Sequence, residues 1–355
     1  MPPTPRNRSA HTPFGVIGVG SYLPSQRRDN ETVATSAGVS AEWILRRTGV
    51  HSRHIASPEE AASDLAAAAV KAACAAAGID LDQLDVIIVA TSTPDELGPA
   101  TACRVQERTG ARHAVALDVT AACSGWLFAA KVAHDWLVCT PQARYAAVVG
   151  VEAYSKFLDT TDRATASLFA DGAAATIFGP TERGGFLDFA LGSDGRFADY
   201  ALIPQGGSRL PNGPGAPSDR RQKISMNGPG VRKFIEDVFP RIVDESLSRN
   251  RIALSDLTTI VTHQPNPVLL TNVAHNAGIT DAQLVIVGDE VGNIGAGSIP
   301  YALATAAGQG RLHEGDLVLA VAFGGGVTWG TALLEWTGAS SVRLAPARLP
   351  HLQAL

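Results

Sequence analysis

The chain repeats one order of elements along its length, and this repeat constrains the fold more than any other feature. Residues 81–94, LDQLDVIIVATSTP, match residues 254–266, LSDLTTIVTHQPN, because each has a polar helix end, an apolar strand and a turn with proline. The first segment is followed by AVALDVTAACSGW and YAAVVGVEA, and the second segment is followed by VIVGDEVGNIGAGS and LVLAVAFGGG. We therefore expect two similar halves, at about 14–185 and 186–338.

The apolar runs of the chain indicate how each half is built. They are rich in Val and Ile and continuous rather than alternating, which is typical of strands covered on both faces. The runs are 14–20, 85–91, 114–119, 145–151, 258–263, 284–289 and 316–324. Ala-rich segments at helical spacing lie between some of them, at 63–78 and 124–138. This alternation predicts an α/β layered architecture.

Three segments lie outside this pattern. Residues 1–13 contain no apolar stretch of the kind found in signal peptides and are expected to form a disordered arm. Residues 204–222 are rich in Gly, Pro and Ser and are expected to form a surface loop. Residues 339–355 have little periodicity and are expected to form a peripheral tail.

Charge and cysteine content exclude several classes of protein. The net charge of −5 offers no global attraction for nucleic acid or an anionic membrane. No apolar run reaches the ~18 residues that a membrane-spanning helix needs. The four cysteines form no CxxC pair and have no histidine cluster beside them, so no metal site is expected. Free thiols of this kind predict a cytoplasmic protein.

One cysteine stands in a context that favours a nucleophile. Cys123, in DVTAACSGW, lies at the expected N-terminus of a helix, where the helix dipole favours the reactive thiolate, and its neighbours are small. A modest lowering of its pKa is therefore expected. The alternative for a cysteine in an apolar stretch is a buried, inert thiol, which is how Cys74, Cys103 and Cys139 are interpreted.

The repeat brings two further residues toward this cysteine. Cys123 and Asn293 occupy corresponding strand-to-helix corners of the two halves, and His263 ends a strand of the second half. A pseudo-twofold axis would bring these corners together in the middle of the molecule. The Gly-rich loop that contains Gly326 has backbone N–H groups that could face an oxyanion.

Four motifs in this order resemble the β-ketoacyl-[acyl carrier protein] synthase III enzymes of the thiolase superfamily. The motifs are DVTAACSGW, THQPN, EVGNIGAGSIP and AFGGGVTWG, and the resemblance extends from about Phe14 to Trp336. In ATSTPDE and PQGGSR the chain is similar to acetoacetyl-CoA synthase-like members. The resemblance implies a thiolase-like duplicated fold with five layers, α-β-α-β-α.

The resemblance also implies an acyltransferase that performs a decarboxylative Claisen condensation. Cys123 would take an acyl group from acyl-CoA, and a malonyl thioester would lose carbon dioxide and attack it to give a β-ketoacyl thioester. His263 and Asn293 would stabilise the enolate oxygen, and the backbone N–H groups of Cys123 and Gly326 would form the oxyanion hole for the acyl carbonyl.

For coenzyme A, the resemblance points to three residues. Trp43 and Arg163 would hold the adenine ring between an aromatic face and a guanidinium plane, and Arg47 would meet the phosphates. It implies a homodimer, no metal and no cofactor beyond the acyl-CoA and malonyl thioester substrates.

Two departures from the family pattern bear on the substrates. Val268 stands where many members have an arginine that docks acyl carrier protein, which favours malonyl-CoA as extender and leaves the carrier protein possible. Gly98 stands where members commonly have a bulky Phe that reaches the neighbouring subunit's acyl pocket, so a starter larger than acetyl is expected. If Leu97 occupies that position instead, the inference weakens.

Other readings of the same motifs remain. A same-fold acyltransferase in secondary metabolism would move the acyl group to an alcohol or amine, and the intact Cys-His-Asn set favours condensation over it. A thiolase would need a second catalytic cysteine after Cys139, and none follows. A hydroxymethylglutaryl-CoA synthase would need a glutamate such as Glu96 or Glu152. A non-catalytic subunit of a heteromeric synthase would be expected to have lost the nucleophile.

Overall fold

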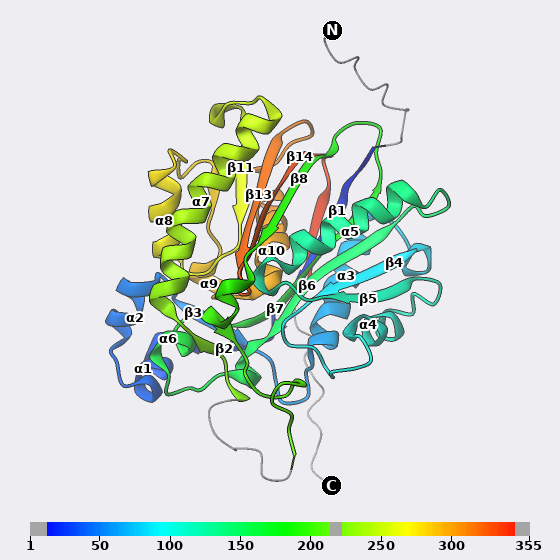
Figure 1. Ribbon diagram of the computed structural model, residues 1–355. Coiled ribbons are helices and arrows are strands. Elements are labelled where there is room, and N and C mark those ends of the chain that lie inside the picture. The colour runs from blue at the N-terminus through cyan, green and yellow to red at the C-terminus, as the bar shows by residue number, and fades with distance from the viewer. Residues whose placement is uncertain (1–12, 214–221, 345–355) are drawn as a thin grey trace.

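Two sheets with the same topology form the framework of the protein. The computed structural model describes residues 13–213 and 222–344. The first sheet contains β1 (Phe14–Tyr22), β4 (Val86–Ala90), β5 (Val115–Val119), β6 (Ala146–Ala153), β7 (Asp171–Pro180) and β15 (Ser340–Leu344). The second contains β8 (Gly185–Ser193), β11 (Thr259–Thr262), β12 (Leu284–Val285), β13 (Leu317–Gly324) and β14 (Thr328–Glu335). Their strands run through the middle of the molecule in Figure 1.

The strand orders of the two sheets correspond one to one. The first sheet has the order β1-β7-β6-β4-β5, with β15 added outside β1, and the second has β8-β14-β13-β11-β12 when it is followed from β8. In each sheet the first two pairings are antiparallel and the next two are parallel. The chain passes from one sheet to the other between β7 and β8, so the predicted boundary after residue 185 falls at the first residue of β8.

Helices separate and cover the two sheets, which makes five layers. α5 (Gly125–Cys139) and α10 (Ser298–Gly308) lie between the sheets. α3 (Ala62–Ala77) and α4 (Thr101–Thr109) cover the outer face of the first sheet. α7 (Gly228–Asn250) and α8 (Pro267–Asn276) cover that of the second. The fold is therefore the α/β thiolase-like fold with the expected order of layers.

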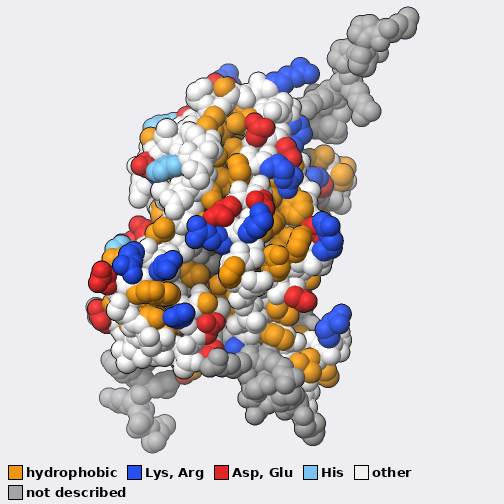
Figure 2. Space-filling view, turned by 60° about the vertical axis from the view of Figure 1, so that its left-hand side comes forward, with side chains coloured by type: hydrophobic (Ala, Val, Ile, Leu, Met, Phe, Trp, Pro, Cys, Tyr) orange, Lys and Arg blue, Asp and Glu red, His pale blue; other side chains and the backbone are white. Residues whose placement is uncertain are grey.

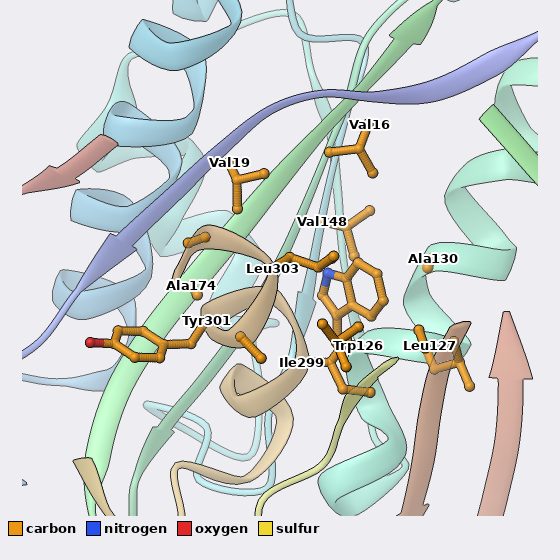
Figure 3. Packing of buried hydrophobic residues seen from close by; sticks show 14 of the residues in the cluster. Val16, Val19, Trp126, Leu127, Ala130, Val148, Ala174, Ile299, Tyr301 and Leu303 are labelled. Atoms are coloured by element: carbon orange, nitrogen blue, oxygen red, sulfur yellow. The ribbon is translucent and has the colours of Figure 1, made fainter. Parts of the chain in front are cut away.

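The central layer holds the largest apolar core. Trp126 and Leu127 of α5 and Ile299 and Leu303 of α10 pack together with strand residues such as Val148, as Figure 3 shows. Trp126 is fully buried, and its indole Nε1–H donates to Thr176 Oγ1 at 3.1 Å, which satisfies its one polar atom. The two helices that follow the Cys123 and Asn293 turns therefore share one apolar core.

The outer helix α3 packs unusually close to the first sheet because β1 contains glycine. A Cβ on Gly20 would lie 2.2 Å from the backbone nitrogen of Ala73, and one on Gly18 would lie 2.5 Å from that of Ala77. α3 is Ala-rich, and every α3 residue that these two Cβ atoms would meet is an alanine. Small residues on both elements therefore set the distance between helix and sheet.

Smaller elements surround the ends of the strands. They are α1 (Asn30–Ala37), α2 (Ala41–Thr48), α6 (Arg163–Ala166), α9 (Gly288–Val291), β2 (Gln26–Asp29), β3 (Ser52–Ile55), β9 (Ala201–Leu202) and β10 (Ser225–Met226). The predicted strand over 284–289 is correct only for Leu284–Val285, since α9 begins at Gly288.

Part of the predicted peripheral tail is a strand instead. Residues 340–344 form β15, which pairs in parallel with β1 from Gly18 to Tyr22 and extends the first sheet by one strand. The segment SSVRL is too short and polar to indicate a strand, and the free edge of β1 is what recruits it. Residues 1–12 of the predicted arm, 214–221 of the predicted loop and 345–355 of the tail lie outside the described residues.

Candidate active site

Cys123 lies on a sharp turn between β5 and α5. A single 3-10 turn, Ala122–Ser124, precedes the helix, and Ala122 adopts a left-handed conformation with φ 47°. This conformation is rare for residues other than glycine and is often found at functional sites. The residue is partly accessible to solvent, although its thiol is surrounded mostly by protein atoms.

The hairpin between β13 and β14 supports this turn from the second half. A Cβ on Gly324 would lie 2.8 Å from the backbone nitrogen of Cys123, so only glycine allows this approach. Thr328 Oγ1 donates to the carbonyl of Ala121 at 3.1 Å, and Ser124 Oγ donates to the carbonyl of Thr328 at 3.2 Å. The cysteine turn is therefore fastened to the opposite half of the molecule.

His263 follows β11 and is buried beside the aromatic ring of Phe323. The two rings meet edge to face with centroids 5.4 Å apart, and the imidazole Nδ1 has no hydrogen-bond partner among the described residues. Burial lowers the pKa of His263 to about 3, although a hydrogen bond with the Gly295 backbone acts to raise it. The imidazole is therefore neutral at physiological pH and has one N–H to donate.

Asn293 is held by backbone and side-chain hydrogen bonds. Its backbone N–H donates to the carbonyl of Leu168 at 2.8 Å, and its carbonyl accepts from the N–H of Ala170 at 3.0 Å. Its side-chain Oδ1 accepts from the backbone N–H of Gly295 at 2.9 Å. Because Oδ1 is engaged, the Nδ2 amide is the donor that remains for a substrate.

Gln264 links the His263 strand end to the segment before Asn293, a role that the sequence analysis missed. Its Oε1 accepts from the N–H groups of Val287 and Gly288, each at 3.1 Å, and its Nε2 donates to the carbonyl of Val285 at 2.9 Å. The only sequence signal for it was a glutamine directly after a candidate catalytic histidine.

One cavity brings the three predicted residues together. Cys123, His263 and Asn293 all line a cavity of about 270 Å³ that lies where the two halves meet. Apolar side chains, among them Phe169 and Phe323, form much of its wall. The structure thus places a thiol, an imidazole and a carboxamide in one largely apolar enclosure, in which a hydrogen bond to a developing charge is strengthened.

The predicted oxyanion-hole glycine, Gly326, lies in the hairpin between β13 and β14. Gly326 does not line the cavity, whereas Gly324, Gly325 and Val327 do. Gly326 has φ 118°, which carries the chain around the hairpin. Gly324 packs directly on the cysteine turn, so Gly325 is the other glycine of this loop that lines the cavity.

The pKa of the thiol also differs from the expectation. Burial raises the pKa of Cys123 to about 12, and the nearby Glu152 carboxylate adds to the effect. Hydrogen bonding from Tyr154 and from the cysteine's own backbone N–H acts in the opposite direction. Desolvation is the largest of these influences, and it opposes the lowering of the thiol pKa that was expected at a helix N-terminus.

Of the three residues predicted for coenzyme A, only Arg47 lines the cavity, and Trp43 lies on the same helix, α2. The Arg163 guanidinium lies over the Trp43 ring, 5.5 Å from its centroid, so the two side chains stack on each other in the structure. Arg47 lines the cavity, and its carbonyl accepts from Asn266 Nδ2 at 3.1 Å.

The predicted acyl-pocket residues do not line this cavity. Leu97 is 86% exposed, and no atom lies within 4 Å of a Cβ built on Gly98. Their segment lies on the surface of the described chain, away from the residues that line the cavity.

The rim of the cavity combines apolar and cationic side chains. Val268 lines it with 38% exposure, and Arg47 and Arg232 are also among the lining residues. Arg232, on α7, pairs with Glu236 on the same helix at 2.8 Å. Figure 2 turns this side, with α7, α8 and α2, toward the viewer, and Lys and Arg side chains lie there beside hydrophobic ones.

The described residues have no group of three or more His, Cys, Asp or Glu side chains placed to hold a metal ion. Nor does any helix in the described part of the chain have the length and apolar character needed to cross a membrane.

Comparison with known proteins assigns this site to a family. Residues 117–195 match the family model of 3-oxoacyl-[acyl-carrier-protein (ACP)] synthase III, and residues 247–336 match the model of its C-terminal part. The chain is 40% identical over 321 residues to the β-ketoacyl-[acyl-carrier-protein] synthase III of Methylococcus capsulatus, with 90% of this chain and 98% of the relative covered. Its similarity to the enzyme of Clostridioides difficile is 38% over 327 residues, covering 92% of this chain and 99% of the relative.

Solved structures agree with this assignment. The 3-oxoacyl-(acyl carrier protein) synthase III of Pseudomonas aeruginosa superposes with a TM-score of 0.84 at 35% identity, covering 93% of this chain and 99% of the other. The priming β-ketosynthase of the R1128 polyketide pathway superposes with a TM-score of 0.86 at 28% identity, covering 92% and 98%. With the fold, the cavity and these relatives in agreement, the chain belongs to the β-ketoacyl-[acyl-carrier-protein] synthase III family of acyltransferases.

Proposed function

We propose that this β-ketoacyl synthase joins an acyl group held on Cys123 to a malonyl thioester. The observation that carries the proposal is the shared cavity of Cys123, His263 and Asn293, because these residues come from both halves of the fold. The cysteine Sγ attacks the carbonyl of an acyl-CoA, the bond to the coenzyme A sulfur breaks, and the acyl group remains on the enzyme as a thioester.

The oxyanion of this step is stabilised by two backbone N–H groups. Those of Cys123 and Gly325 are the proposed donors, with Gly325 replacing Gly326 for the reason given above. Such donors act on the tetrahedral intermediate, in which the carbonyl oxygen becomes charged.

The second step requires stabilisation of an enolate and no strong base. The carbon–carbon bond to the malonyl carboxylate breaks, carbon dioxide leaves, and the electron pair stays on the thioester as an enolate. Neutral His263 and the Nδ2 amide of Asn293 donate to the enolate oxygen. The enolate carbon attacks the acyl-cysteine, the bond to Sγ breaks, and a β-ketoacyl thioester leaves.

The extender is proposed to arrive on acyl carrier protein. The relatives are named for that carrier, and the cavity rim supplies two arginines, Arg47 and Arg232, that compensate for the uncharged Val268. The exposed Arg232–Glu236 pair is weak, so Arg232 is free to exchange its partner for an acidic carrier. This proposal reverses the preference for malonyl-CoA that Val268 alone suggests.

A matched pair of arginines on α7 tests the carrier. Arg232→Ala should lower kcat/KM for malonyl-ACP several-fold and leave that for malonyl-CoA unchanged. Arg241→Ala, which breaks an equivalent pair with Glu245 away from the cavity, is the control. A strict preference of the native enzyme for malonyl-CoA would overturn the carrier assignment.

We further propose a homodimer in the cytoplasm. The 86% exposed Leu97 and the open surface at Gly98 need a covering partner if they are to reach an acyl group, and a second copy is the simplest one. The four cysteines are unpaired, which fits a reducing compartment.

Measuring acylation and decarboxylation separately tests the condensation. Mass spectrometry of the intact protein after incubation with a panel of acyl-CoAs should show an acyl adduct on Cys123 that is absent from Cys123→Ala and retained in Cys103→Ala and Cys139→Ala. Release of labelled carbon dioxide from the malonyl thioester should then accompany the product. Acylation without decarboxylation would instead support transfer to an alcohol or amine.

A further inference from the structure

Arg53 is a fully buried arginine that the proposed mechanism does not use. It lies on β3, which forms a short hairpin with β2 outside the two main sheets. Its guanidinium is held by two neutral groups, since Nη1 donates to Asn30 Oδ1 and Nη2 donates to the carbonyl of Ser167. Its Nε has no hydrogen-bond partner among the described residues. Burying a charge with so few partners is costly, so the contacts that it makes need an explanation.

The Ser167 carbonyl belongs to the segment that holds the backbone of Asn293. The next residue, Leu168, accepts from the Asn293 N–H at 2.8 Å, and the N–H of Ala170 donates to the Asn293 carbonyl at 3.0 Å. These bonds form an isolated parallel bridge between Phe169 and Asn293. Leu168, Phe169 and Asn293 all line the cavity, so both sides of the bridge contribute to its wall.

The aliphatic part of Arg53 packs on the other side of the same bridge. A Cβ on Gly292 would lie 3.1 Å from Arg53 Cγ and 2.9 Å from Ala170 Cβ, so the arginine stem lies directly against the residue before Asn293. The β3 strand lies beside α9, which ends at Val291 (Figure 1). One side chain therefore contacts both of the segments that meet at Asn293.

The groups around Arg53 are themselves fixed. Asp171, the first residue of β7, accepts from the N–H of Ala56 at 2.7 Å and so attaches the end of β3 to the first sheet. Asn30 Nδ2 donates to the carbonyl of Val50 at 2.8 Å, which orients the Oδ1 that accepts from Arg53. The hairpin is therefore a firm support for the segments on which the arginine acts.

We propose that Arg53 is a positioning residue for Asn293. It holds the Ser167 carbonyl with its guanidinium and supports Gly292 with its stem, and so fixes the backbone from which the Asn293 amide reaches the enolate oxygen. This inference rests on the proposed function, because the enolate belongs to the second half of that reaction. Arg53 does not line the cavity, so it acts through Asn293 without touching the substrate.

Removal of the guanidinium should impair decarboxylation and spare acylation. In Arg53→Met an apolar stem still packs on Gly292, but Ser167 and Asn30 lose their donor. A donor that is held less firmly stabilises the enolate less. We therefore expect carbon dioxide release by enzyme acylated beforehand to fall about tenfold, and acyl-adduct formation to stay within about twofold of the native rate.

Arg28→Met is the matched control. Arg28 lies directly opposite Arg53 in the hairpin, and its Nε and Nη2 are buried without a hydrogen-bond partner among the described residues. The substitution removes a positive charge from the same place without removing a bond to the Asn293 bridge, so both half-reactions should keep their native rates. A loss as large as that in Arg53→Met would mean that the charge of the hairpin matters rather than the contacts of Arg53, and would overturn the proposal.

A double variant distinguishes positioning from a general structural effect. If Arg53 acts through the Asn293 amide, Arg53→Met should have no further effect on decarboxylation in Asn293→Ala, because the donor that it positions is already gone. Losses that multiply in the double variant would contradict the proposal.

Hydrogen exchange reports on the Asn293 backbone without any substrate. The Asn293 N–H is protected by its bond to Leu168, so exchange in the peptide spanning residues 288–298 should become at least about tenfold faster in Arg53→Met and stay native in Arg28→Met. Circular dichroism and thermal unfolding report whether each variant is folded. If Arg53→Met does not fold, Arg53→Lys takes its place, because it keeps the charge but offers one nitrogen to two acceptors, and changes in the same direction are expected.

These measurements separate a failure of the positioning role from a failure of the proposed function. If the native protein releases no carbon dioxide from a malonyl thioester but the Arg53 variant exchanges faster at residues 288–298, the proposed function fails and the positioning role stands. If the native protein is active, native carbon dioxide release in a folded Arg53 variant overturns the positioning role whatever its exchange rate. Native exchange in that variant overturns it in either case.

Discussion

The side-chain Oδ1 of Asn293 accepts a 2.9 Å hydrogen bond from the backbone N–H of Gly295. This bond fixes which end of the carboxamide faces the cavity, because the engaged oxygen leaves Nδ2 as the free donor. An amide that turned over would present an acceptor to the enolate oxygen and would repel it. The Gly295 turn is therefore as important to the site as Asn293 itself.

We expect Asn293→Ala to impair decarboxylation much more than acylation. Loss of one aimed donor typically costs roughly 100- to 1000-fold in the step that it stabilises. The measurement is carbon dioxide release from labelled malonyl thioester by enzyme acylated beforehand, beside the rate of acyl-adduct formation. Equal losses in both half-reactions would contradict this division of labour.

Gly324→Ala should distort the turn that contains Cys123, although Gly324 belongs to the other half of the molecule. The added methyl would lie 2.8 Å from the Cys123 nitrogen, which is backbone and cannot move aside alone. We expect acylation to fall at least about tenfold and the free energy of unfolding to drop by about 1–3 kcal/mol. Gly195→Ala, where no atom lies within 4 Å of the new Cβ, is the control and should resemble the native protein in both measurements.

Trp43→Ala and Arg163→Ala should weaken binding of acyl-CoA. An adenine ring between the two side chains would replace the stacking that they now make on each other, worth about 1–2 kcal/mol, or roughly five- to thirtyfold in Kd. Calorimetry with coenzyme A measures this loss. Acetyl-pantetheine lacks the adenine, so acylation by it should be unaffected; an equal loss with both donors would place the adenine elsewhere.

The stability of the protein should fall between pH 6.5 and 8 because of Glu152. The carboxyl titrates near 8 in the native state and near 4.5 when unfolded, so between these values the unfolded state releases a proton that the native state retains. Unfolding therefore becomes easier as the pH rises. His263 has the opposite slope between pH 3 and 6.5, which leaves the Glu152 slope alone above 6.5.

Urea unfolding at a series of pH values measures this slope. The native protein should lose about 2 kcal/mol over that interval, and Glu152→Gln should lose much less. Identical slopes in the two proteins would mean that Glu152 has an ordinary pKa.

The strands that were predicted and those that were missed differ in composition. β4 and β13 consist largely of Val, Ile, Leu and Ala, and such apolar runs indicate a buried strand. β7 is equally buried but reads DGAAATIFGP, and its Gly and Ala residues indicate no strand by themselves. Its small side chains are explained only by the close approach of α3, which is a property of the packed molecule.

Local patterns and the order of the motifs were enough to predict the repeated halves, the family and the three side chains that meet in the cavity. Other features could be seen only in the folded molecule. Gly325 rather than Gly326 lines the cavity, and Leu97 and Gly98 lie outside it. Residues 340–344 join the first sheet. The tertiary structure also decided the pKa of Cys123, because desolvation depends on everything packed around the sulfur, including the carboxyl of Glu152 and the hydroxyl of Tyr154. A helix N-terminus can be recognised along the chain, but burial exists only once distant segments have come together.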